Sequence, residues 1–250
     1  MKIVLIGGTG LIGSQMAKLL SEQHEVIAAS PKTGVNTLTK EGLEKALEKA
    51  DVVVDVSNSP SFADDDVMDF FKTSTSNIVA ACKKAGVKHL IILSVVGTAQ
   101  LQESGYFRAK QVQEDLIRAS GLPYTIVQAT QFFEFAGSIA YMCTVDGKVM
   151  LSNSLSQPIA SIDVATFMSQ TALQPPANAT QEIGGPQEIA LDQWISQYLK
   201  AVQKPMKVVT DSDALYSGAG LKERSLVPES PVFLGSIHYV NWIKEQENKS

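Results

Sequence analysis

The sequence predicts an α/β fold, a doubly wound parallel sheet with a small C-terminal α+β cap. Two observations lead to this prediction. Over residues 1–130, short apolar runs rich in β-branched residues alternate with stretches whose apolar residues recur at helical spacing. The first of these runs leads into a glycine-dense turn and then a helix, an order typical of parallel α/β sheets. Because parallel strands need crossover connections of one hand, helices should cover both faces of the sheet.

The beginning of the chain carries the most informative motif. Ile3–Ile6 is expected to form a strand buried on both faces, and a helix is expected after the turn. The glycines of the turn fit two registers, Gly8-x-Gly10-x-x-Gly13 and Gly7-x-x-Gly10-x-x-Gly13, of which we favour the second. Side chains here would keep the main chain away from a diphosphate, which the N-terminus of the following helix attracts. The motif therefore predicts a dinucleotide site, with a tight turn that binds nothing as the alternative.

The remaining elements follow from the same periodicities. Within the first half, further strands are expected at 25–29, 51–56, 89–93 and 124–127, with a minor one near Val35 and Asn36. Helices are expected at 41–49, capped by Thr39, and at 65–86 and 105–120. Beyond residue 130 the pattern loosens, with helices expected at 132–142, 163–173 (capped by Asp163), 191–202 and 237–246, and extended segments at 148–151 and 180–183.

The length and the pattern favour one domain over residues 1–250. Residues 1–130 would form the dinucleotide-binding core, and residues 131–250 the last sheet elements and a substrate cap. The net charge of -5 argues against nucleic acid or an anionic membrane as the main partner. No apolar run is long enough to span a bilayer, and the N-terminal run breaks into glycines rather than a signal-peptide cleavage site. Two cysteines, Cys82 and Cys143, are expected to be packing residues, and a cytoplasmic location is expected.

The end of the second strand indicates which dinucleotide is preferred. An NAD site usually places a carboxylate there to bind the ribose 2′-hydroxyl, but residues 26–36 contain none. Ser30 and Lys32 stand there instead, and a hydroxyl with an ammonium would hold a 2′-phosphate. We therefore expect NADP(H) as the cofactor, unless Lys32 is only a solvated loop residue.

A second informative stretch lies around the fourth main strand and the helix after it. Tyr106 and Lys110 are one helical turn apart and share a face, and Ser94 ends the preceding strand at the sheet edge where ligands bind. A nearby ammonium lowers the pKa of a tyrosine toward neutrality and can also bond the cofactor ribose. A serine hydroxyl could orient the substrate oxygen. These three residues are the expected catalytic set; the alternative is that Tyr106 only packs against the cofactor.

Taken together, the glycine motif, the Ser94…Tyr106-x-x-x-Lys110 set and residues 122–127 resemble the NmrA-like, atypical branch of the short-chain dehydrogenase/reductase superfamily. The resemblance extends over residues 1–165, including 157–160 and 163–165, and is faint in the C-terminal part. It implies a Rossmann-type fold, NADP(H) binding, Tyr106 as the acid, Lys110 as its partner and Ser94 as a helper. The branch also contains dinucleotide sensors without turnover. The chain departs from the superfamily pattern at Ala109, often serine, and at Pro31, often arginine in NADP-binding relatives.

The segment after the strand at 124–127 is expected to reach the nicotinamide end of the site. Substrate contacts are expected from Gln131, Phe132, Phe133 and Phe135, whose aromatic rings would suit a flat or hydrophobic acceptor; the alternative is that these rings only pack the cap onto the sheet. Tyr141, Tyr216, Trp194 and Trp242 are assigned to the core. The expected cofactor contacts are Gly7, Thr9, Gly10, Leu11, Ile12, Gly13, Ser30, Lys32, Thr33, Ser57, Asn58, Ser59, Lys110, Ala129 and Thr130.

Three functions are compatible with these features. The favoured one is an NADPH-dependent oxidoreductase that transfers a hydride to a small carbonyl or quinone. The second is a non-catalytic NADP(H) sensor that signals to a protein partner. A nucleotide-sugar epimerase or dehydratase is less favoured because it needs a larger C-terminal lobe. No metal site is expected because the histidines are dispersed, and the chain could form a homo-oligomer.

Overall fold

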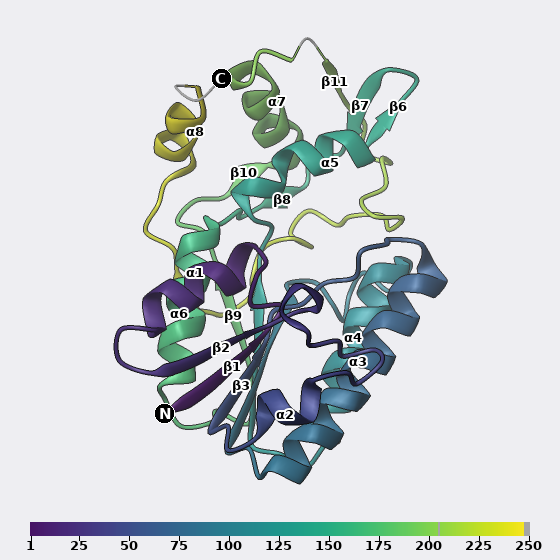
Figure 1. Cartoon of the computed structure of the whole chain (residues 1–250). Helices are drawn as coiled ribbons and strands as arrows, with labels where there is room; N and C mark the ends of the chain where they lie inside the picture. Colours follow the sequence, from purple (N-terminus) through teal and green to yellow (C-terminus); the bar gives the residue numbers. More distant parts are fainter. Residues whose placement is uncertain (205, 248–250) are drawn as a thin grey trace.

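A computed structural model describes residues 1–204 and 206–247. Its centre is a parallel seven-stranded sheet with helices on both faces, a Rossmann-type α/β fold as predicted (Figure 1). The strands lie in the order β12-β9-β5-β4-β3-β1-β2. Their bounds are β1 Lys2–Ile6, β2 Glu25–Ala29, β3 Val52–Asp55, β4 His89–Val95, β5 Tyr124–Ala129, β9 Thr180–Gly184 and β12 Pro231–Leu234.

The order of the strands reverses direction between β1 and β3. β1 pairs with β2 on one side and with β3 on the other, so the connections on either side of it run to opposite edges. In open α/β sheets, ligands bind beyond the carboxyl ends of the strands at such a switch point. The glycine turn after β1 and the loop after β3 both lie there, which positions the candidate site.

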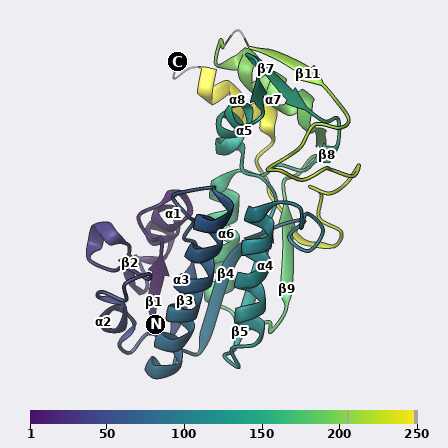
Figure 2. The ribbon, with the colours of Figure 1, turned by 90° about the vertical axis from the view of Figure 1, so that its right-hand side faces the viewer.

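The two faces of the sheet are covered by different helices (Figures 1 and 2). Ile3 and Leu5 pack in the cluster with α1 and α6, whereas Val4 and Ile6 pack in the cluster with α2, α3 and α4. This alternation is the two-residue period of a strand buried on both faces. The helices on the first face are α1 Leu11–Leu20 and α6 Ser161–Ala172, and those on the second are α2 Leu43–Leu47, α3 Asp64–Ala85 and α4 Gly105–Arg118.

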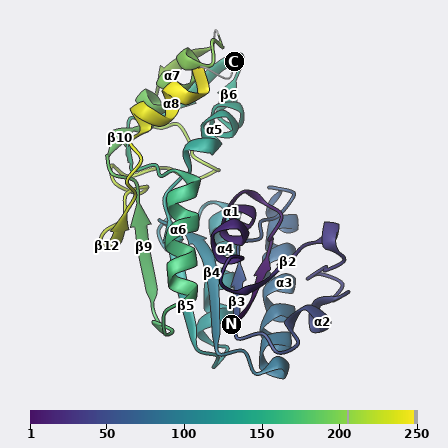
Figure 3. The same ribbon diagram turned by 60° about the vertical axis from the view of Figure 1, so that its left-hand side comes forward.

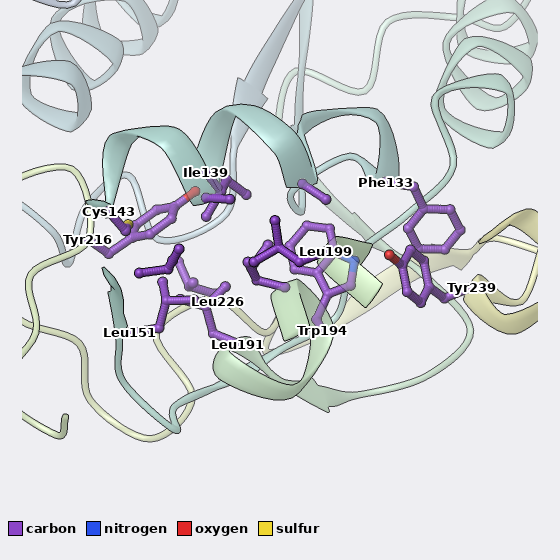
Figure 4. Close-up of a cluster of buried hydrophobic side chains, with 14 of the residues drawn as sticks. Phe133, Ile139, Cys143, Leu151, Leu191, Trp194, Leu199, Tyr216, Leu226 and Tyr239 are labelled. Carbon is purple, nitrogen blue, oxygen red and sulfur yellow. The ribbon is translucent and has the colours of Figure 1, made fainter. Parts of the chain in front are cut away.

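The C-terminal part builds a smaller lobe beyond the carboxyl end of the sheet. It contains α5 Ala136–Met142, α7 Leu191–Ala201 and α8 Tyr239–Glu247, around a core centred on Trp194 (Figure 4). A three-stranded sheet of β6 Thr144–Val145, β7 Lys148–Leu151 and β11 Lys207–Thr210 lies beside them, with a two-stranded pair of β8 Leu155–Ser156 and β10 Ile189–Ala190. The chain also sends β9 and β12 back into the main sheet, where they lie side by side at one edge (Figure 3).

Several sequence expectations need correction. Val35 and Asn36 form no strand, and α2 follows Gly42 rather than a Thr39 cap. Asp163 lies inside the first turn of α6, where its carboxylate accepts hydrogen bonds from Ser236 and Ile237, so it anchors the C-terminal segment instead of capping the helix. The strands β6, β8, β10, β11 and β12 were not expected, because all are short. All but β6, which forms a hairpin with β7, also depend on partners far away in the sequence.

Both cysteines are free and buried, as expected for packing residues. Trp194 and Tyr216 are also buried, but Tyr141 is 83% exposed and is not a core residue. Within the described part of the chain, each helix is too short or too polar to cross a bilayer.

Candidate functional site

The glycine turn, residues 7–13, is shaped by main-chain packing that excludes side chains. A Cβ on Gly8 would lie 2.6 Å from the Ala28 Cα, and one on Gly13 would overlap the Gly7 carbonyl oxygen. Gly7 has a φ of +79°, which favours glycine. These contacts bring α1 close to β1 and β2, and they leave no room for larger residues at positions 7, 8 and 13.

The helix α1 begins at Leu11, so its first helical turn forms the end of the glycine turn. Gly10 is the N-cap and has no side-chain cap, and the first turn contains no acidic residue. The first amide groups of a helix have no intrahelical acceptor, so they attract an anion together with the helix dipole. Bare main chain and an uncapped helix end fit a diphosphate, and they place Thr9, Leu11 and Ile12 where their N–H groups can reach it.

The loop after β3 is in contact with the glycine turn. A Cβ on Gly7 would lie 2.8 Å from the Ser57 nitrogen, so the two loops touch at the switch point. Ser57 donates its N–H and its hydroxyl to Asp55 Oδ1, at 2.9 and 2.6 Å. Asn58 is exposed, whereas Ser59 is buried and accepts a hydrogen bond from the Ser61 N–H. The loop thus brings Ser57 to the turn and leaves Asn58 open to solvent.

The residues expected to select NADP follow β2. Ser30 and Thr33 form a reciprocal capping box around the short 3-10 helix η1, Pro31–Thr33. The Ser30 N–H donates to Thr33 Oγ1 at 2.9 Å, and Thr33 Oγ1 lies 2.8 Å from the Ala28 carbonyl oxygen. Lys32 is exposed on the outer side of this helix. The two hydroxyls therefore shape the loop, and Lys32 is the side chain that can move to a 2′-phosphate.

Lys110 is a buried lysine beneath this edge of the sheet. It is only 2% exposed, and its Nζ donates to the Leu93 carbonyl oxygen at 2.8 Å and to Gln113 Oε1. The Nζ also lies 4.4 Å from the centre of the Phe71 ring. Burial lowers the pKa of Lys110 to about 8, with the carboxylates of Asp55 and Glu114 opposing part of this shift.

Tyr106 lies one turn before Lys110 on the same helix and contacts the same phenyl ring. Its ring centre is 6.2 Å from that of Phe71, 5.7 Å from that of Phe107 and 5.8 Å from that of Phe62. Burial raises the pKa of Tyr106 to about 12. The sequence predicted a lowered pKa, but the ammonium of Lys110 is directed into the protein toward Gln113 instead of toward the phenol. Desolvation by the aromatic rings therefore dominates.

The structure does not bring Ser94 to Tyr106. The Ser94 hydroxyl donates to Glu114 Oε1 at 2.5 Å, and Glu114 lies two turns further along α4 than Tyr106. The reason is the alternation of side chains along β4: Leu90 and Ile92 face the α3 and α4 side, and Ser94 continues that row. Ser94 therefore lies under α4 in this structure.

A layer of buried polar side chains fills the space between these strand ends and α4. Asp55, Ser94 and Gln128 come from β3, β4 and β5, and they meet polar residues of α4. We call the set the polar layer; its members are Asp55, Ser94, Lys110, Gln113, Glu114 and Gln128.

Sequence reasoning missed Asp55, Gln113 and Glu114. A carboxylate inside the buried run 51–56 was an available signal, because a buried charge needs a partner. Polar residues three and four positions after Lys110, on the helix face that carries it, were a second signal.

The segment after β5 is more enclosed than expected. The Thr130 hydroxyl donates to the Gln157 carbonyl oxygen at 2.6 Å and its N–H to that of Ile183 at 3.1 Å, and Ala129 is buried. Gln131 is 6% exposed, and neither of its amide atoms has a hydrogen-bond partner within the described chain. Buried polar atoms of this kind usually bind a water or a ligand, so Gln131 is the available contact.

The three phenylalanines divide into two groups. Phe132 and Phe135 stack at a ring-centre distance of 5.1 Å, and Phe135 is 42% exposed. Phe133 is 1% exposed and packs against Tyr239 in the C-terminal lobe (Figure 4). Its ring also contacts that of Trp242. Phe133 is therefore a core residue of that lobe. Phe132 is only 9% exposed, so Phe135 is the one of the three that is open to solvent.

Tyr216 also belongs to this region, although the sequence assigned it only to the core. It is buried in the same apolar cluster that Tyr106 packs against, and its ring lies beside Cys143 (Figure 4). Burial raises the pKa of Tyr216.

Comparisons with known proteins agree with this geometry. The chain is 24% identical over 223 residues to a (4-alkanoyl-5-oxo-2,5-dihydrofuran-3-yl)methyl phosphate reductase of Streptomyces griseus, covering 82% of this chain and 75% of that protein. It is 23% identical over 185 residues to the photosystem II assembly factor Ycf39 of Synechocystis, covering 67% of this chain. It spans only 57% of the length of that factor.

Solved structures resemble the chain in fold. RMD from Pseudomonas aeruginosa, complexed with NADPH, aligns with a TM-score of 0.69 and 14% identity over 100% of this chain and 99% of that chain. The dTDP-4-dehydrorhamnose reductase of Yersinia enterocolitica aligns with a TM-score of 0.68 and 16% identity, over 99% and 97% of the two chains. Residues 7–175, more than half of the chain, match the protein family described as NAD(P)H-binding. The predicted relationship to NAD(P)-binding proteins is thus confirmed, and this chain belongs to the NAD(P)H-binding family.

Proposed function

We propose that the protein is an NADPH-dependent reductase that transfers a hydride to a small carbonyl or quinone. One observation carries the proposal: a turn that requires glycine at positions 7, 8 and 13 lies at the sheet edge to which α4 brings Tyr106 and Lys110. The reductase from Streptomyces griseus and the divinyl chlorophyllide a 8-vinyl-reductase of Arabidopsis thaliana, 27% identical over 226 residues, support a reductive role.

Each residue of the candidate site has a separate role in this proposal. The main chain of the glycine turn binds the diphosphate, and Ser57 packs against that turn. Lys110 donates a hydrogen bond to the ribose next to the nicotinamide. NADPH supplies the hydride when bound. Tyr106 donates a proton to the acceptor oxygen; its raised pKa keeps the phenol protonated at neutral pH, as a donor requires. Gln131 offers its free amide to the nicotinamide end or to the acceptor.

We also propose a preference for NADPH over NADH. Lys32 is an exposed cation after β2, where no carboxylate would repel a 2′-phosphate. Replacing Lys32 by alanine should weaken NADPH binding severalfold and leave NADH binding unchanged, since only NADPH carries the extra phosphate. Equal losses for both nucleotides would contradict this preference.

The reductase activity is tested with one substitution and a matched control. NADPH oxidation is measured with a panel of quinones, aldehydes and ketones, first with the natural protein. Tyr106→Phe should lose carbonyl turnover by about a hundredfold, a typical contribution of general acid catalysis, and keep its NADPH affinity. Tyr141→Phe removes a hydroxyl from an exposed tyrosine and should change neither value. Unchanged carbonyl turnover in Tyr106→Phe would remove the assigned role of the phenol.

A second candidate function is a non-catalytic NADP(H) sensor. The direction of Ser94 toward Glu114 favours it, because the serine then offers no hydroxyl to an acceptor beside Tyr106. A sensor should bind NADPH and NADP⁺ with unequal affinities and oxidise NADPH with none of the acceptors. The two free cysteines agree with a reducing compartment, and we propose the cytoplasm for either function.

A further inference from the structure

A chain of hydrogen bonds links two parts of the candidate cofactor site that come from different elements. At one end, Ser57 of the loop that touches the glycine turn donates twice to Asp55 Oδ1. At the other end, Lys110 Nζ of α4 donates to Gln113 Oε1. Gln113 Nε2 completes the chain by donating to Asp55 Oδ2 at 3.1 Å. The ammonium of Lys110 is thus connected to the loop at the switch point.

The chemistry of the groups fixes the orientation of the Gln113 amide. Burial raises the pKa of Asp55, whereas its hydrogen bonds from Ser57, the Lys110 charge and the hydrogen bond from Gln113 favour the carboxylate. An ammonium can only donate and the ionised carboxylate can only accept, so the oxygen of Gln113 must face Lys110 and its NH₂ must face Asp55. Asp55 and Lys110 are each 2% exposed and Gln113 is 1% exposed, so bulk water cannot replace any of the three. Replacing Asp55 or Gln113 by a side chain with a different set of donors and acceptors therefore breaks the chain of hydrogen bonds.

Besides Gln113, one main-chain acceptor and one aromatic ring contact the ammonium. The Phe71 ring from α3 lies 4.4 Å from Nζ, and the Leu93 carbonyl oxygen from β4 accepts one bond. Among the charged groups, Asp55 on β3 and Glu114 on α4 both favour the protonated lysine. Glu114 is itself held by Arg118 at 2.7 Å, and the thiol of Cys82 on α3 lies near Asp55.

We propose that Asp55 and Gln113 are positioning residues that hold the Lys110 ammonium in place and tie it to the Ser57 loop. The inference rests on the proposed function, in which Lys110 bonds the cofactor ribose. Two of the three N–H donors of the ammonium are used by the Leu93 carbonyl oxygen and Gln113, which leaves one for a cofactor hydroxyl. Asp55 also supplies the charge that compensates this buried lysine.

An isosteric exchange tests the inference. Gln113→Glu places two carboxylates against each other, and Asp55→Asn places two NH₂ groups against each other. Each single variant should weaken NADPH binding, measured by the fluorescence of bound NADPH at neutral pH, by about tenfold, the loss expected for one hydrogen bond in a charged network. The double variant reverses both groups together, so the ammonium again meets an oxygen and every donor an acceptor. Its affinity should return to within about threefold of the natural protein.

The pH dependence separates positioning from a general loss of structure. In Gln113→Glu, protonation of one carboxyl restores an O–H donor between the two side chains, so NADPH affinity should recover as the pH is lowered. Asp55→Asn introduces no new titrating group and should show no such recovery. A defect that is only structural would give both variants the pH profile of the natural protein.

The same helix provides a matched control. Gln111 Nε2 donates to Asp115 Oδ1 at 2.8 Å, the same kind of pair as Gln113 and Asp55, but it is exposed. Gln111→Glu should leave NADPH affinity unchanged within about twofold, because solvent screens exposed pairs.

The outcomes distinguish this inference from the proposed function. Single variants with natural affinity, or a double variant no better than the singles, would overturn the positioning role alone. A natural protein without saturable NADPH affinity would overturn the proposed function and this inference together. If a single variant does not fold, the double variant decides, since a folded double variant with near-natural affinity requires the restored chain, and any other result contradicts it.

Discussion

The glycine turn and the β4–α4 region, residues 89–118, reach the same edge of the sheet by different physical means. In the turn, main-chain packing against β2 and the Ser57 loop leaves no room for a Cβ on Gly7, Gly8 or Gly13, so the shape depends on the absence of those Cβ atoms. In the β4–α4 region, the direction of Ser94 and Lys110 depends on buried partners supplied by other elements. A site formed by the main chain can therefore be predicted from local sequence, whereas the geometry of a site formed by side chains depends on tertiary contacts.

The largest expected effect comes from adding one methyl group to the glycine turn. Gly13→Ala places a Cβ against the Gly7 carbonyl oxygen and 2.6 Å from the Gly8 Cα, so α1 must move away from β1. We expect a loss of about 3 kcal/mol in the free energy of unfolding, typical of severe overpacking, and loss of measurable NADPH binding. Chemical denaturation and NADPH fluorescence would measure the two changes.

Two glycines sharpen this prediction. A Cβ on Gly10 would meet only the Gly7 carbonyl oxygen, at 3.2 Å, so Gly10→Ala should keep most of the stability and still weaken binding of a diphosphate. A Cβ on Gly220 would meet only the Glu103 Oε2 atom, at 4.0 Å, and its φ is ordinary, so Gly220→Ala should change neither property. Equal stability of the Gly13 and Gly220 variants would contradict the packing argument.

The second effect concerns His89, at the amino end of β4, the strand that carries Ser94. His89 Nε2 lies 2.8 Å from Thr125 Oγ1, and burial lowers the pKa of His89 to about 4 from 6.5. Below pH 6.5 the unfolded chain binds a proton that the folded chain refuses, so stability should fall between pH 6.5 and pH 4. The full loss corresponds to about 3 kcal/mol.

Urea unfolding at a series of pH values would measure this loss. His89→Gln should flatten the pH dependence over that range, whatever its own stability at neutral pH. His238→Gln changes an exposed histidine and should leave the dependence as it is. A slope that persists in His89→Gln would show that other groups dominate the acid range.

The third effect concerns Ser94, for which the sequence and the structure suggest different roles. Removing its hydroxyl leaves the buried carboxylate of Glu114 with one partner fewer, so Ser94→Ala should cost about 1–3 kcal/mol in unfolding free energy. If Ser94 acts only beneath α4, kcat/KM for carbonyl reduction should change less than about threefold. A large loss of kcat with unchanged stability would restore the catalytic role. Ser76→Ala, at an exposed helical site, is the stability control.

Most of the sheet could be predicted because its signals are local. The short apolar run Ile3–Ile6 predicts a strand buried on both faces, and the structure places Ile3 and Leu5 on one face and Val4 and Ile6 on the other. The glycines after this run predict a tight turn. Strand β9 and its neighbour at the edge of the sheet, β12, mark the limit of prediction from local sequence. β9 is expected from its sequence, whereas β12 is short and half exposed, and it becomes a strand through pairing with β9.

The candidate site was predictable in its residues but not in its contacts. The spacing of Tyr106 and Lys110 places both on the inner side of α4, and the structure keeps both there. The spacing alone does not say that both residues contact the Phe71 ring, or that the ammonium bonds Gln113, which in turn bonds Asp55. Those contacts join residues from three elements, and no local pattern records such a combination.

The smallest effect is spectroscopic and concerns the phenol itself. If the ammonium of Lys110 acted on Tyr106, its pKa would fall toward neutrality; burial among Phe62, Phe71 and Phe107 instead raises it to about 12. The phenolate absorbance of the natural protein minus that of Tyr106→Phe should therefore show no titration between neutral pH and the ordinary tyrosine pKa of about 10. The same difference with Tyr141→Phe, an exposed tyrosine, provides the control. A Tyr106 titration well below pH 10 would mean that Lys110 reaches the phenol in solution, and the two regions would then both be set by local spacing.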